Sequence, residues 1–447
     1  MAAGAGPEIE LRGVLLSPGY LRLLLLSGVL GVPIALACFF FVGLQNWLSR
    51  QVWQQLPLAV GFHQAPWWWP LPALALAGLI LVPIVTRMPG GGGHAPVFGL
   101  GGGEPIGPRE LPGVVLAALT TLPLGVCLGP ESPLMGLGSG LALLALGRMR
   151  ALTGQGGDPR AGAILAGAGS TAAISTILGG PLVAAVLVVE SAGLAGGRLT
   201  ALLLPALLAS ATGALVFTGF GHWTGLSIGA LSLPHVPPDT TPDAGDFLWG
   251  VLIAALVAAV VTGARSLGLR THDWTGRRTA PRTLACALAV GACLAVFGLL
   301  TGRPPGQAAL SGEETLVELA ADPHAWSLAA LVALVLCKGL AWGISLGALR
   351  GGPIFPAVLV GAAVGVACAG LPGLGVTPAL AVGMTAAAAV LTGLPFSSTV
   401  LSVLLLGPDA HNQMPLIVVA AVVAFGVGQL LTRPVGEDAR GPNHSAG

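Results

Sequence analysis

The stretch Gly129-Pro130-Glu131-Ser132-Pro133 places one carboxylate between two prolines, with apolar sequence on both sides. Gly129 and Pro130 end any helix that enters from the N-terminal side. Pro133 suits the first turn of a new helix, where a missing N–H costs nothing. We therefore predict a helix that begins inside an apolar environment, where its free N–H groups and the positive end of its dipole attract anions.

The composition is that of a membrane protein. The chain has 447 residues, of which 54% are hydrophobic and 8% charged, with a mean hydropathy of +0.87, whereas a soluble domain carries roughly 25% charged residues. Its 69 glycines and 36 prolines are too many for a bundle of straight helices and indicate tilted, interrupted ones. The predicted fold class is an all-α polytopic membrane protein. Glu131 is then a functional hypothesis, the alternative being a helix cap near the membrane surface.

Several partners and cofactors are not expected from the composition. A net charge of +1 predicts neither nucleic acid binding nor a polybasic lipid-binding tail. The six cysteines lie in apolar segments without paired spacing and are interpreted as packing residues. The spacing of His, Cys and carboxylates predicts no metal site, and no cofactor is expected. The N-terminus shows no signal-peptide pattern.

The apolar segments give the expected organisation. A soluble arm is expected at 1–19, a membrane domain at 20–431 and a short polar tail at 432–447. The loop at 218–246 carries Asp239, Asp243 and Asp246 without Lys or Arg, whereas the loop after the span near 247–264 is arginine-rich, with Arg265, Arg270, Arg277, Arg278 and Arg282. The positive-inside rule places the arginine-rich loop in the cytoplasm. We expect a multi-pass protein of the bacterial inner (plasma) membrane, surrounded by lipid.

An internal repeat divides the membrane domain. Gly129-Pro130-x-x-Pro133 recurs as Gly352-Pro353-Ile354-Phe355-Pro356. Downstream, Gly169-x-Thr171-Ala172-Ala173 with Gly179-x-Pro181 recurs as Gly383-x-Thr385-Ala386-Ala387 with Gly393-x-Pro395. Two halves that each contain an interrupted helix predict a binding site between them at mid-depth, as in a transporter or channel.

The residues at the two interrupted helices suit a small monovalent anion. The second helix offers only backbone amides, at Ile354 and Phe355, and a full positive charge there would hold an anion too tightly for turnover. Glu131 would compete with the anion as a tethered carboxylate, and its protonation would release it. This predicts a pH-sensitive gate or a proton-coupled exchange step.

At these residues the chain resembles the CLC family of chloride channels and chloride/proton exchangers, over most of residues 20–431. Residues 129–133 match the family's G-[KR]-E-G-P element, with Glu131 at the gating glutamate, and residues 352–356 resemble the G-x-F-x-P element, so that Ile354 and Phe355 would donate N–H groups to the anion. Gly92-Gly93-His94-Ala95-Pro96 aligns with the G-S-G-I-P element. Pro181 to Glu190 is similar to the dimer-interface helix. The resemblance implies an inverted-repeat fold, with halves at about 20–217 and 247–431, in a homodimer with one pore per subunit.

The chain departs from the family pattern at three positions. Gly93 stands where the family has an anion-coordinating serine, and the pore tyrosine has no counterpart because the only tyrosine is Tyr20. Ser191 stands where exchangers often have a second, inner glutamate. Glu190 is a candidate substitute on the proton path, with helix capping as the alternative, and His94 could add a titratable group, the alternative being an ordinary loop histidine. Ser132 and Gly92 complete the candidate anion-binding set.

The sequence leaves three functions open. The first is chloride permeation gated by Glu131, as a channel or as a proton-linked exchanger with altered coupling, and the second is the fluoride-exporting branch of the same family. The third, a polytopic membrane enzyme, would need two catalytic groups within reach of each other. The membrane segments offer only Glu131, Glu190 and Lys338, and Lys338 is expected to snorkel or to pair near a helix end. We therefore expect no enzyme, and no regulatory nucleotide-binding domain after the membrane part.

Overall fold

A computed structural model describes residues 11–99, 104–153, 159–178, 180–193, 196–224, 233, 236–237 and 241–432. These residues contain α-helices, short 3-10 turns, one π-helical turn and a single isolated β-bridge, without a β-strand among them. The first half contains α1(Leu11–Leu15), α2(Pro18–Arg50), α3(Leu56–Ala59), α4(Pro70–Arg87), α5(Leu111–Thr121), α6(Glu131–Thr153), α7(Pro159–Ser175), α8(Pro181–Ser191) and α9(Gly196–Thr224). The second half contains α10(Ala244–Gly276), α11(Thr279–Thr301), α12(Glu313–Ala321), α13(Leu328–Ala348), α14(Ile354–Cys368), α15(Val376–Thr392), α16(Pro395–Leu406) and α17(Ala410–Leu431).

The helices confirm the predicted fold class of an all-α polytopic membrane protein. Seven segments are long and apolar enough to cross a membrane. They are Pro18–Ala59, Pro70–Arg87, Gly196–Trp223, Ala244–Gly276, Thr279–Thr301, Leu328–Ala348 and Ala410–Leu431. Five further apolar helices, among them α5, α8 and α14, are shorter, and such short helices are tolerated at membrane depth where protein surrounds them.

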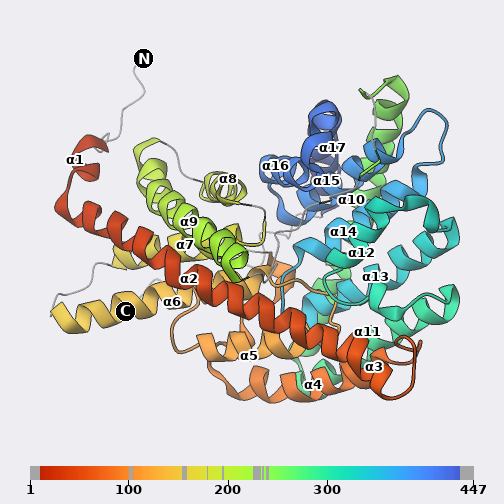
Figure 1. Cartoon of the computed structure of the whole chain (residues 1–447), viewed down its shortest axis with the longest axis horizontal. Coiled ribbons are helices and arrows are strands. Elements are labelled where there is room, and N and C mark those ends of the chain that lie inside the picture. Colours follow the sequence, from red (N-terminus) through yellow and green to blue (C-terminus); the bar gives the residue numbers. More distant parts are fainter. Residues whose placement is uncertain are drawn as a thin grey trace, which may run out of the picture.

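The two halves lie beside each other and are joined by packing between them. In Figure 1 the N-terminal half occupies the left and lower part of the molecule and the C-terminal half the right part. Within the halves, α6 packs on α7, α2 on α9, α14 on α15 and α10 on α13. Between the halves, α4 packs along α11 and α8 contacts α16.

The same glycine contact recurs in both halves. A Cβ added to Gly138 of α6 would overlap the carbonyl oxygen of Gly169 of α7, and one added to Gly361 of α14 would overlap that of Gly383 of α15. Gly138 and Gly361 each lie seven residues after the first residue of their helix. The internal repeat seen in the sequence therefore corresponds to one packing device used twice. Gly179 of that repeat lies outside the described residues.

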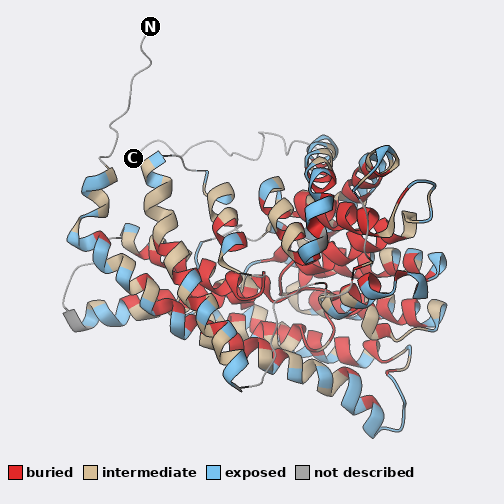
Figure 2. Ribbon diagram, turned by 45° about the horizontal axis from the view of Figure 1, so that its top comes forward, coloured by how far each residue is buried: buried red, intermediate tan, exposed pale blue. Residues whose placement is uncertain are grey.

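Burial is deepest in the second half. Every residue of α14 from Ile354 to Val366 is buried, and α15 is nearly as enclosed. Figure 2 shows this as the most continuous block of buried ribbon in the molecule. The interrupted helix α14 is thus surrounded by protein along most of its length, which allows a helix end to lie inside the apolar interior.

The arginine-rich loop expected at 265–282 is much shorter in the structure. α10 continues to Gly276, so that Arg265 and Arg270 lie on this helix, and α11 already begins at Thr279. The sequence from 265 to 275 contains no proline that would end the helix. At the other end of α10, Asp243 and Asp246 form a capping box, whereas Asp239 lies outside the described residues.

Candidate functional site

The two interrupted helices are joined directly before their first turns. Gly129 N–H donates to the Gly352 carbonyl at 2.7 Å, and Gly352 N–H donates to the Gly129 carbonyl at 2.5 Å. This antiparallel bridge lies two residues before α6 and two residues before α14. The N-terminal ends of both helices, predicted from Pro133 and Pro356, are therefore held close together.

Glu131 is enclosed between these helix ends and not at a surface. It is 0% exposed, and its Oε1 accepts a 2.8 Å hydrogen bond from the Phe355 N–H at the start of α14. Its Oε2 is buried without a hydrogen-bond partner among the described residues. A Cβ on Gly352 would overlap this oxygen, so a side chain there would displace the carboxylate from its place. The structure brings together the carboxylate and one of the two amides that the sequence assigned to the anion.

Two cavities flank Glu131, and the residues on either side of it line different ones. Ser132 and Pro133 line a cavity of about 300 Å³ together with Gly351, which we call the His94 cavity. Leu128 and Pro130 line a second cavity of about 310 Å³, which we call the Glu313 cavity. Glu131 lines neither of the two. Its carboxylate therefore occupies the partition between two hollows.

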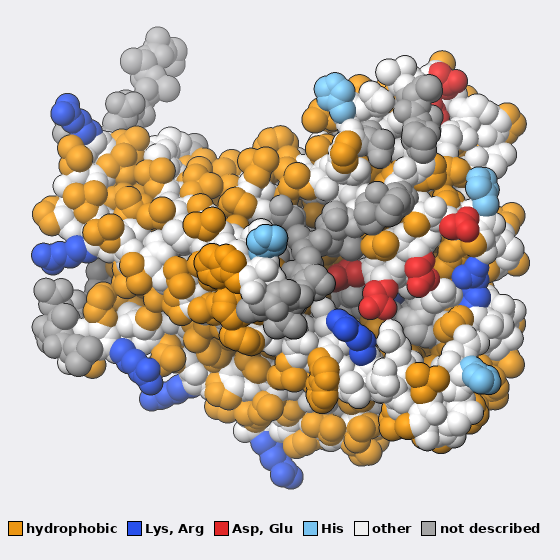
Figure 3. Space-filling view, in the orientation of Figure 1, with side chains coloured by type: hydrophobic (Ala, Val, Ile, Leu, Met, Phe, Trp, Pro, Cys, Tyr) orange, Lys and Arg blue, Asp and Glu red, His pale blue; other side chains and the backbone are white. Residues whose placement is uncertain are grey.

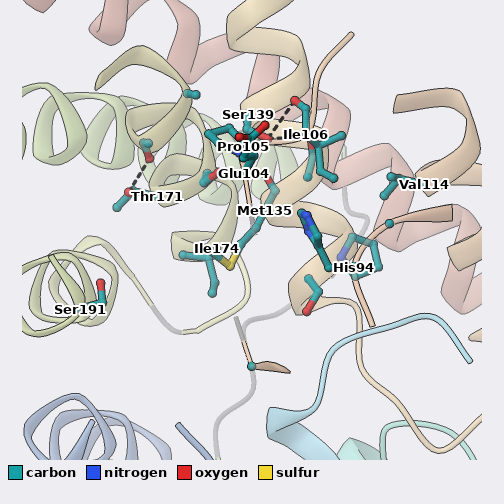
Figure 4. A pocket seen from close by; sticks show the side chains of 18 of the residues that line it. His94, Glu104, Pro105, Ile106, Val114, Met135, Ser139, Thr171, Ile174 and Ser191 are labelled. Carbon is teal, nitrogen blue, oxygen red and sulfur yellow. Dashed lines mark hydrogen bonds between the residues drawn. The ribbon is translucent and has the colours of Figure 1, made fainter. Parts of the chain in front are cut away.

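The His94 cavity gathers four of the residues predicted to bind the anion, namely Gly92, Gly93, His94 and Ser132. Ile354 and Phe355 do not line it and are only 1% and 2% exposed, because they lie behind the partition with Glu131. Figure 4 shows His94 and Met135 beside this cavity, with Glu104 and Ser139 further along it and Ser191 on its far wall.

The glycine stretch before His94 is an ordered turn. Residues Pro89–Gly92 form a 3-10 turn, and Gly92 and Gly93 have φ of +76° and +99°, a region that residues with a Cβ rarely adopt. Phe98, in the turn that follows, stacks edge-on against His272 of α10 at 5.0 Å between ring centroids. The turn thereby packs at the arginine-bearing end of α10.

Arg350 also lines the His94 cavity, and sequence reasoning missed it. Its Nε donates to the Gly91 carbonyl at 3.0 Å and its Nη1 to the Leu349 carbonyl at 3.1 Å. The Thr121 hydroxyl donates to the Arg350 carbonyl at 2.7 Å. The available signal was an arginine directly before Gly351-Gly352, at the position where the chain enters the second interrupted helix.

The Glu313 cavity has acidic side chains on one wall. Glu313, Glu314 and Glu318 of α12 line it, and no Lys or Arg of the described part of the chain does. α12 is not among the helices that could span a membrane. Burial, with a smaller contribution from the carboxylate of Glu131, raises the pKa of Glu313 to about 8. Figure 3 shows acidic side chains close together on the right of the molecule, while basic ones lie mostly along the left and lower edges.

Lys338 is fully buried, at 0% exposure, so the expectation that it snorkels is wrong, and it pairs instead with backbone carbonyls between a 3-10 turn and α12. Its Nζ donates to the carbonyl oxygens of Ala308, Ala309 and Leu310 at 3.0, 3.1 and 3.1 Å. Leu310 has a φ of +59°, and a turn of this shape leaves its carbonyls without helical partners. The ammonium supplies those partners and holds the wall of the Glu313 cavity.

Glu190 holds the N-terminal end of α16. Its carboxylate accepts hydrogen bonds from the Phe396 N–H at 2.9 Å and from the N–H and hydroxyl of Ser397, both at 2.6 Å. Glu190 does not line the His94 cavity, whereas its neighbour Ser191 does. This geometry favours the capping alternative for Glu190.

The described residues contain no group of three or more His, Cys, Asp and Glu side chains that could hold a metal ion. The six cysteines are free thiols. The polar groups nearest to the helix ends are backbone N–H groups, one carboxylate, one hydroxyl and one guanidinium. Such a set favours the binding of an anion or a proton over that of a cation.

Comparisons with known proteins agree with this arrangement. A family model described as "Voltage gated chloride channel" matches residues 99–429. The chain is 28% identical over 352 residues to the "Putative ion-transport protein YfeO" of Salmonella paratyphi A, covering 75% of this chain and 78% of that protein. It is 27% identical over 365 residues to the protein of the same name from Escherichia coli O139:H28, covering 78% and 80%.

Solved structures share the fold. A CLC-type fluoride/proton antiporter is similar with a TM-score of 0.69 at 21% identity, covering 92% of this chain and 96% of that one. A slow cyanobacterial Cl⁻/H⁺ antiporter is similar with a TM-score of 0.71 at 17% identity, covering 93% and 97%. The inverted-repeat arrangement of interrupted helices is thus confirmed.

Proposed function

Because the chain belongs to the voltage-gated chloride channel family, we propose that it moves a small monovalent anion, chloride in the first place, across the membrane under the control of Glu131. The observation that carries the proposal is the place of this carboxylate. It lies between two cavities and is bonded to the Phe355 N–H, at the helix end where an anion would be stabilised.

The deprotonated side chain of Glu131 closes the path by competition. It takes the place of an anion at the α14 amides, and its own negative charge repels a second anion nearby. Once protonated, the carboxyl group has no net charge and binds the amides less strongly. The place is then free for an anion, so that proton uptake and anion passage are linked at one residue.

The membrane orientation follows from the basic side chains. Arg277 and Arg278 lie between α10 and α11, at the end where the turn of Phe98 contacts His272. The positive-inside rule places this end, and with it the His94 cavity, on the cytoplasmic side. The Glu313 cavity, which includes Pro304 beyond the far end of α11, then faces outward. The membrane is taken to be the inner membrane of a bacterium.

Fluoride is the second candidate anion. The observation that favours it is Gly93, which lines the His94 cavity at the position of the anion-coordinating serine, where the fluoride-exporting branch that the sequence also resembles departs from the family pattern too. The fluoride/proton antiporter shares only the fold with this chain. Parallel flux measurements with the two halides decide between them.

A homodimer is part of the proposal. α8, which resembles the family's interface helix, has Leu182 61% exposed, and the adjoining α16 has Phe396 57% exposed. α8 contacts α16, so the two side chains belong to neighbouring elements that a second subunit could cover. Cross-linking or sizing in mild detergent that detects only monomers would contradict this part.

The test is chloride efflux from proteoliposomes with internal pH followed at the same time. Uphill proton movement driven by a chloride gradient establishes exchange and shows that Ser191 does not abolish coupling. Chloride flux without proton movement establishes a channel or an uncoupled carrier. Absence of both chloride and fluoride flux overturns the proposed function.

A further inference from the structure

One hydroxyl beside the His94 cavity, that of Ser132, has no hydrogen-bond partner among the described residues. Ser132 lines the cavity, and its Oγ is buried. A buried hydroxyl without a partner costs free energy unless something else occupies it. The neighbouring Ser139 differs, because its hydroxyl donates to the Gly136 carbonyl at 3.1 Å. Ser132 is therefore available to a ligand in the cavity.

Arg350 lines the same cavity, and its guanidinium has more donors than the protein uses. Arg350 uses Nε and Nη1 for the Gly91 and Leu349 carbonyls. A guanidinium has five N–H donors, so three remain without a partner in the described part of the chain. The two carbonyls fix its plane, and a pre-oriented fork of N–H groups is well suited to anions.

The bridge between the halves holds these two residues on the same side of Glu131. Ser132 directly follows Glu131 at the start of α6. Gly351 lies between Arg350 and the bridged Gly352, and it lines the same cavity. An anion in the His94 cavity next to the Glu131 carboxylate could thus accept hydrogen bonds from the Ser132 hydroxyl of the first half and from the Arg350 guanidinium of the second.

We propose that Ser132 Oγ and the Arg350 guanidinium together bind the transported anion, a halide or nitrate, in the His94 cavity. This inference rests on the proposed function and adds to it an anion-binding site with a charged side chain next to Glu131. The hydroxyl of Ser132 takes over the contribution that Gly93 does not make, and Arg350 adds a permanent charge. His94 and Glu104, the other titratable groups that line the cavity, are both exposed and serve as its rim.

Turnover remains compatible with the positive charge at this site. Two backbone carbonyls already accept from Arg350 and so offset part of its field. The cavity of about 300 Å³ also has room for water around a single anion. The anion is thereby bound without being fully dehydrated, as conduction through a series of sites requires.

The experiment measures chloride binding to purified protein by calorimetry and the half-saturating chloride concentration on the His94 side of oriented proteoliposomes. Arg350→Gln is expected to raise both constants by about tenfold and Ser132→Ala by about threefold, since hydrogen bonds to charged groups are the stronger ones. Arg350→Lys, which keeps the charge, is expected to lie closer to wild type than Arg350→Gln. Arg87→Gln, which removes an exposed arginine that does not line the cavity, is the matched control and leaves both constants unchanged.

The double variant Ser132→Ala/Arg350→Gln separates binding from loop support. If both residues bind the same anion, the double variant should raise the chloride constants by less than the product of the increases in the two single variants. Independent, multiplicative effects would indicate that Arg350 only supports the Gly91 turn and would overturn the inference. Unchanged chloride constants in both single variants, with flux intact, would overturn it as well. Absence of flux and binding in the wild-type protein would instead contradict the proposed function itself.

Discussion

The two cavities beside Glu131 are nearly equal in size and differ in the charged side chains that line them. The His94 cavity of about 300 Å³ is lined by Arg350 as well as Glu104, whereas among the described residues the Glu313 cavity of about 310 Å³ is lined by three glutamates and by no Lys or Arg. Glu131 separates them. The difference teaches that the two sides of Glu131 are not interchangeable: a guanidinium is available on one side only, and a group of three carboxylates lies on the other.

This contrast has a local origin in both cases. Arg350 comes from the loop that leads into α14, and the glutamates come from the short helix α12. Lys338 stabilises the turn before α12 by hydrogen bonds to the carbonyls of residues 308–310. Each cavity therefore depends on one or two side chains that can be changed singly. Four substitutions test the contrast, from the largest expected effect to the smallest.

Replacing the partition itself should have the largest effect. Glu131→Ala is expected to connect the two cavities and to abolish the pH dependence of anion flux. The flux at neutral pH should rise by about tenfold or more, which corresponds to the free energy of one hydrogen bond to a charged group. Glu131→Gln, which resembles the protonated side chain, should also remove the pH dependence. Flux measurements between pH 5 and pH 8 decide, and a wild-type pH profile in Glu131→Ala would contradict the gate.

Lys338→Met should destabilise the wall of the Glu313 cavity. Two buried carbonyls and one half-buried carbonyl lose their donor, and each buried loss costs roughly 1 to 3 kcal/mol, so we expect about 2 kcal/mol or more of lost stability. Thermal unfolding in detergent measures it. Arg50→Met, at an exposed end of α2, is the control for loss of a positive charge. A melting temperature equal to that of the control would exclude the supporting role of Lys338.

Glu190→Ala tests whether the His94 side uses this carboxylate for proton transfer or for structure. Loss of three hydrogen bonds at the start of α16 should cost about 2 to 3 kcal/mol of stability. The proton-to-anion ratio of any exchange should stay the same. Glu190→Gln, which can still accept hydrogen bonds, should lose less stability. A changed proton-to-anion ratio in a stably folded Glu190→Gln variant would indicate that Glu190 takes part in proton transfer.

Glu313→Gln should have the smallest effect, and this effect should grow as the pH rises from 4.5 toward 8. The pKa of Glu313 is about 8 instead of the ordinary 4.5, so the folded protein holds this proton more tightly than the unfolded chain does. Stability is therefore lost as the pH rises from 4.5 through 8. The variant removes this loss and should narrow the difference in melting temperature between pH 6 and pH 9 by about 2 °C or more. Asp273→Asn, which removes an exposed carboxylate of α10, is the control, and an unchanged difference in the Glu313→Gln variant would contradict the pKa.

The fold could be predicted because its signals are local. Apolar length identifies most of the spans, Pro and Gly mark the interrupted helices, and the spacing of Gly169 and Gly383 reveals the repeat. The boundary of α10 was missed because apolar length ends near 264 while the helix continues through a polar, basic stretch. Hydropathy indicates which residues can lie in the lipid, whereas the helix itself can continue beyond the membrane boundary.

The site could be predicted only in part. Glu131, Ser132 and the glycines before His94 carry their own signals of backbone conformation and charge. Arg350, Glu313 and the buried position of Lys338 did not, because each depends on contacts between segments distant in the sequence. Arg350 meets Gly91, and Lys338 meets the turn at 308–310. No local pattern fixes which carbonyls lack a partner, so these roles follow from the three-dimensional structure alone.

The paired glycines of α6–α7 and α14–α15 also limit how the sequence can drift. At Gly138, Gly169, Gly361 and Gly383, any side chain would collide with the backbone of the facing helix, while Gly263, Gly339 and Gly426 have open space where a Cβ would lie. In a library of single substitutions selected for function, the first group should tolerate almost no replacement and the second should accept alanine. Sequences that descend from this chain and keep its function should therefore retain these four glycines, and with them the crossing of α6 on α7 and of α14 on α15.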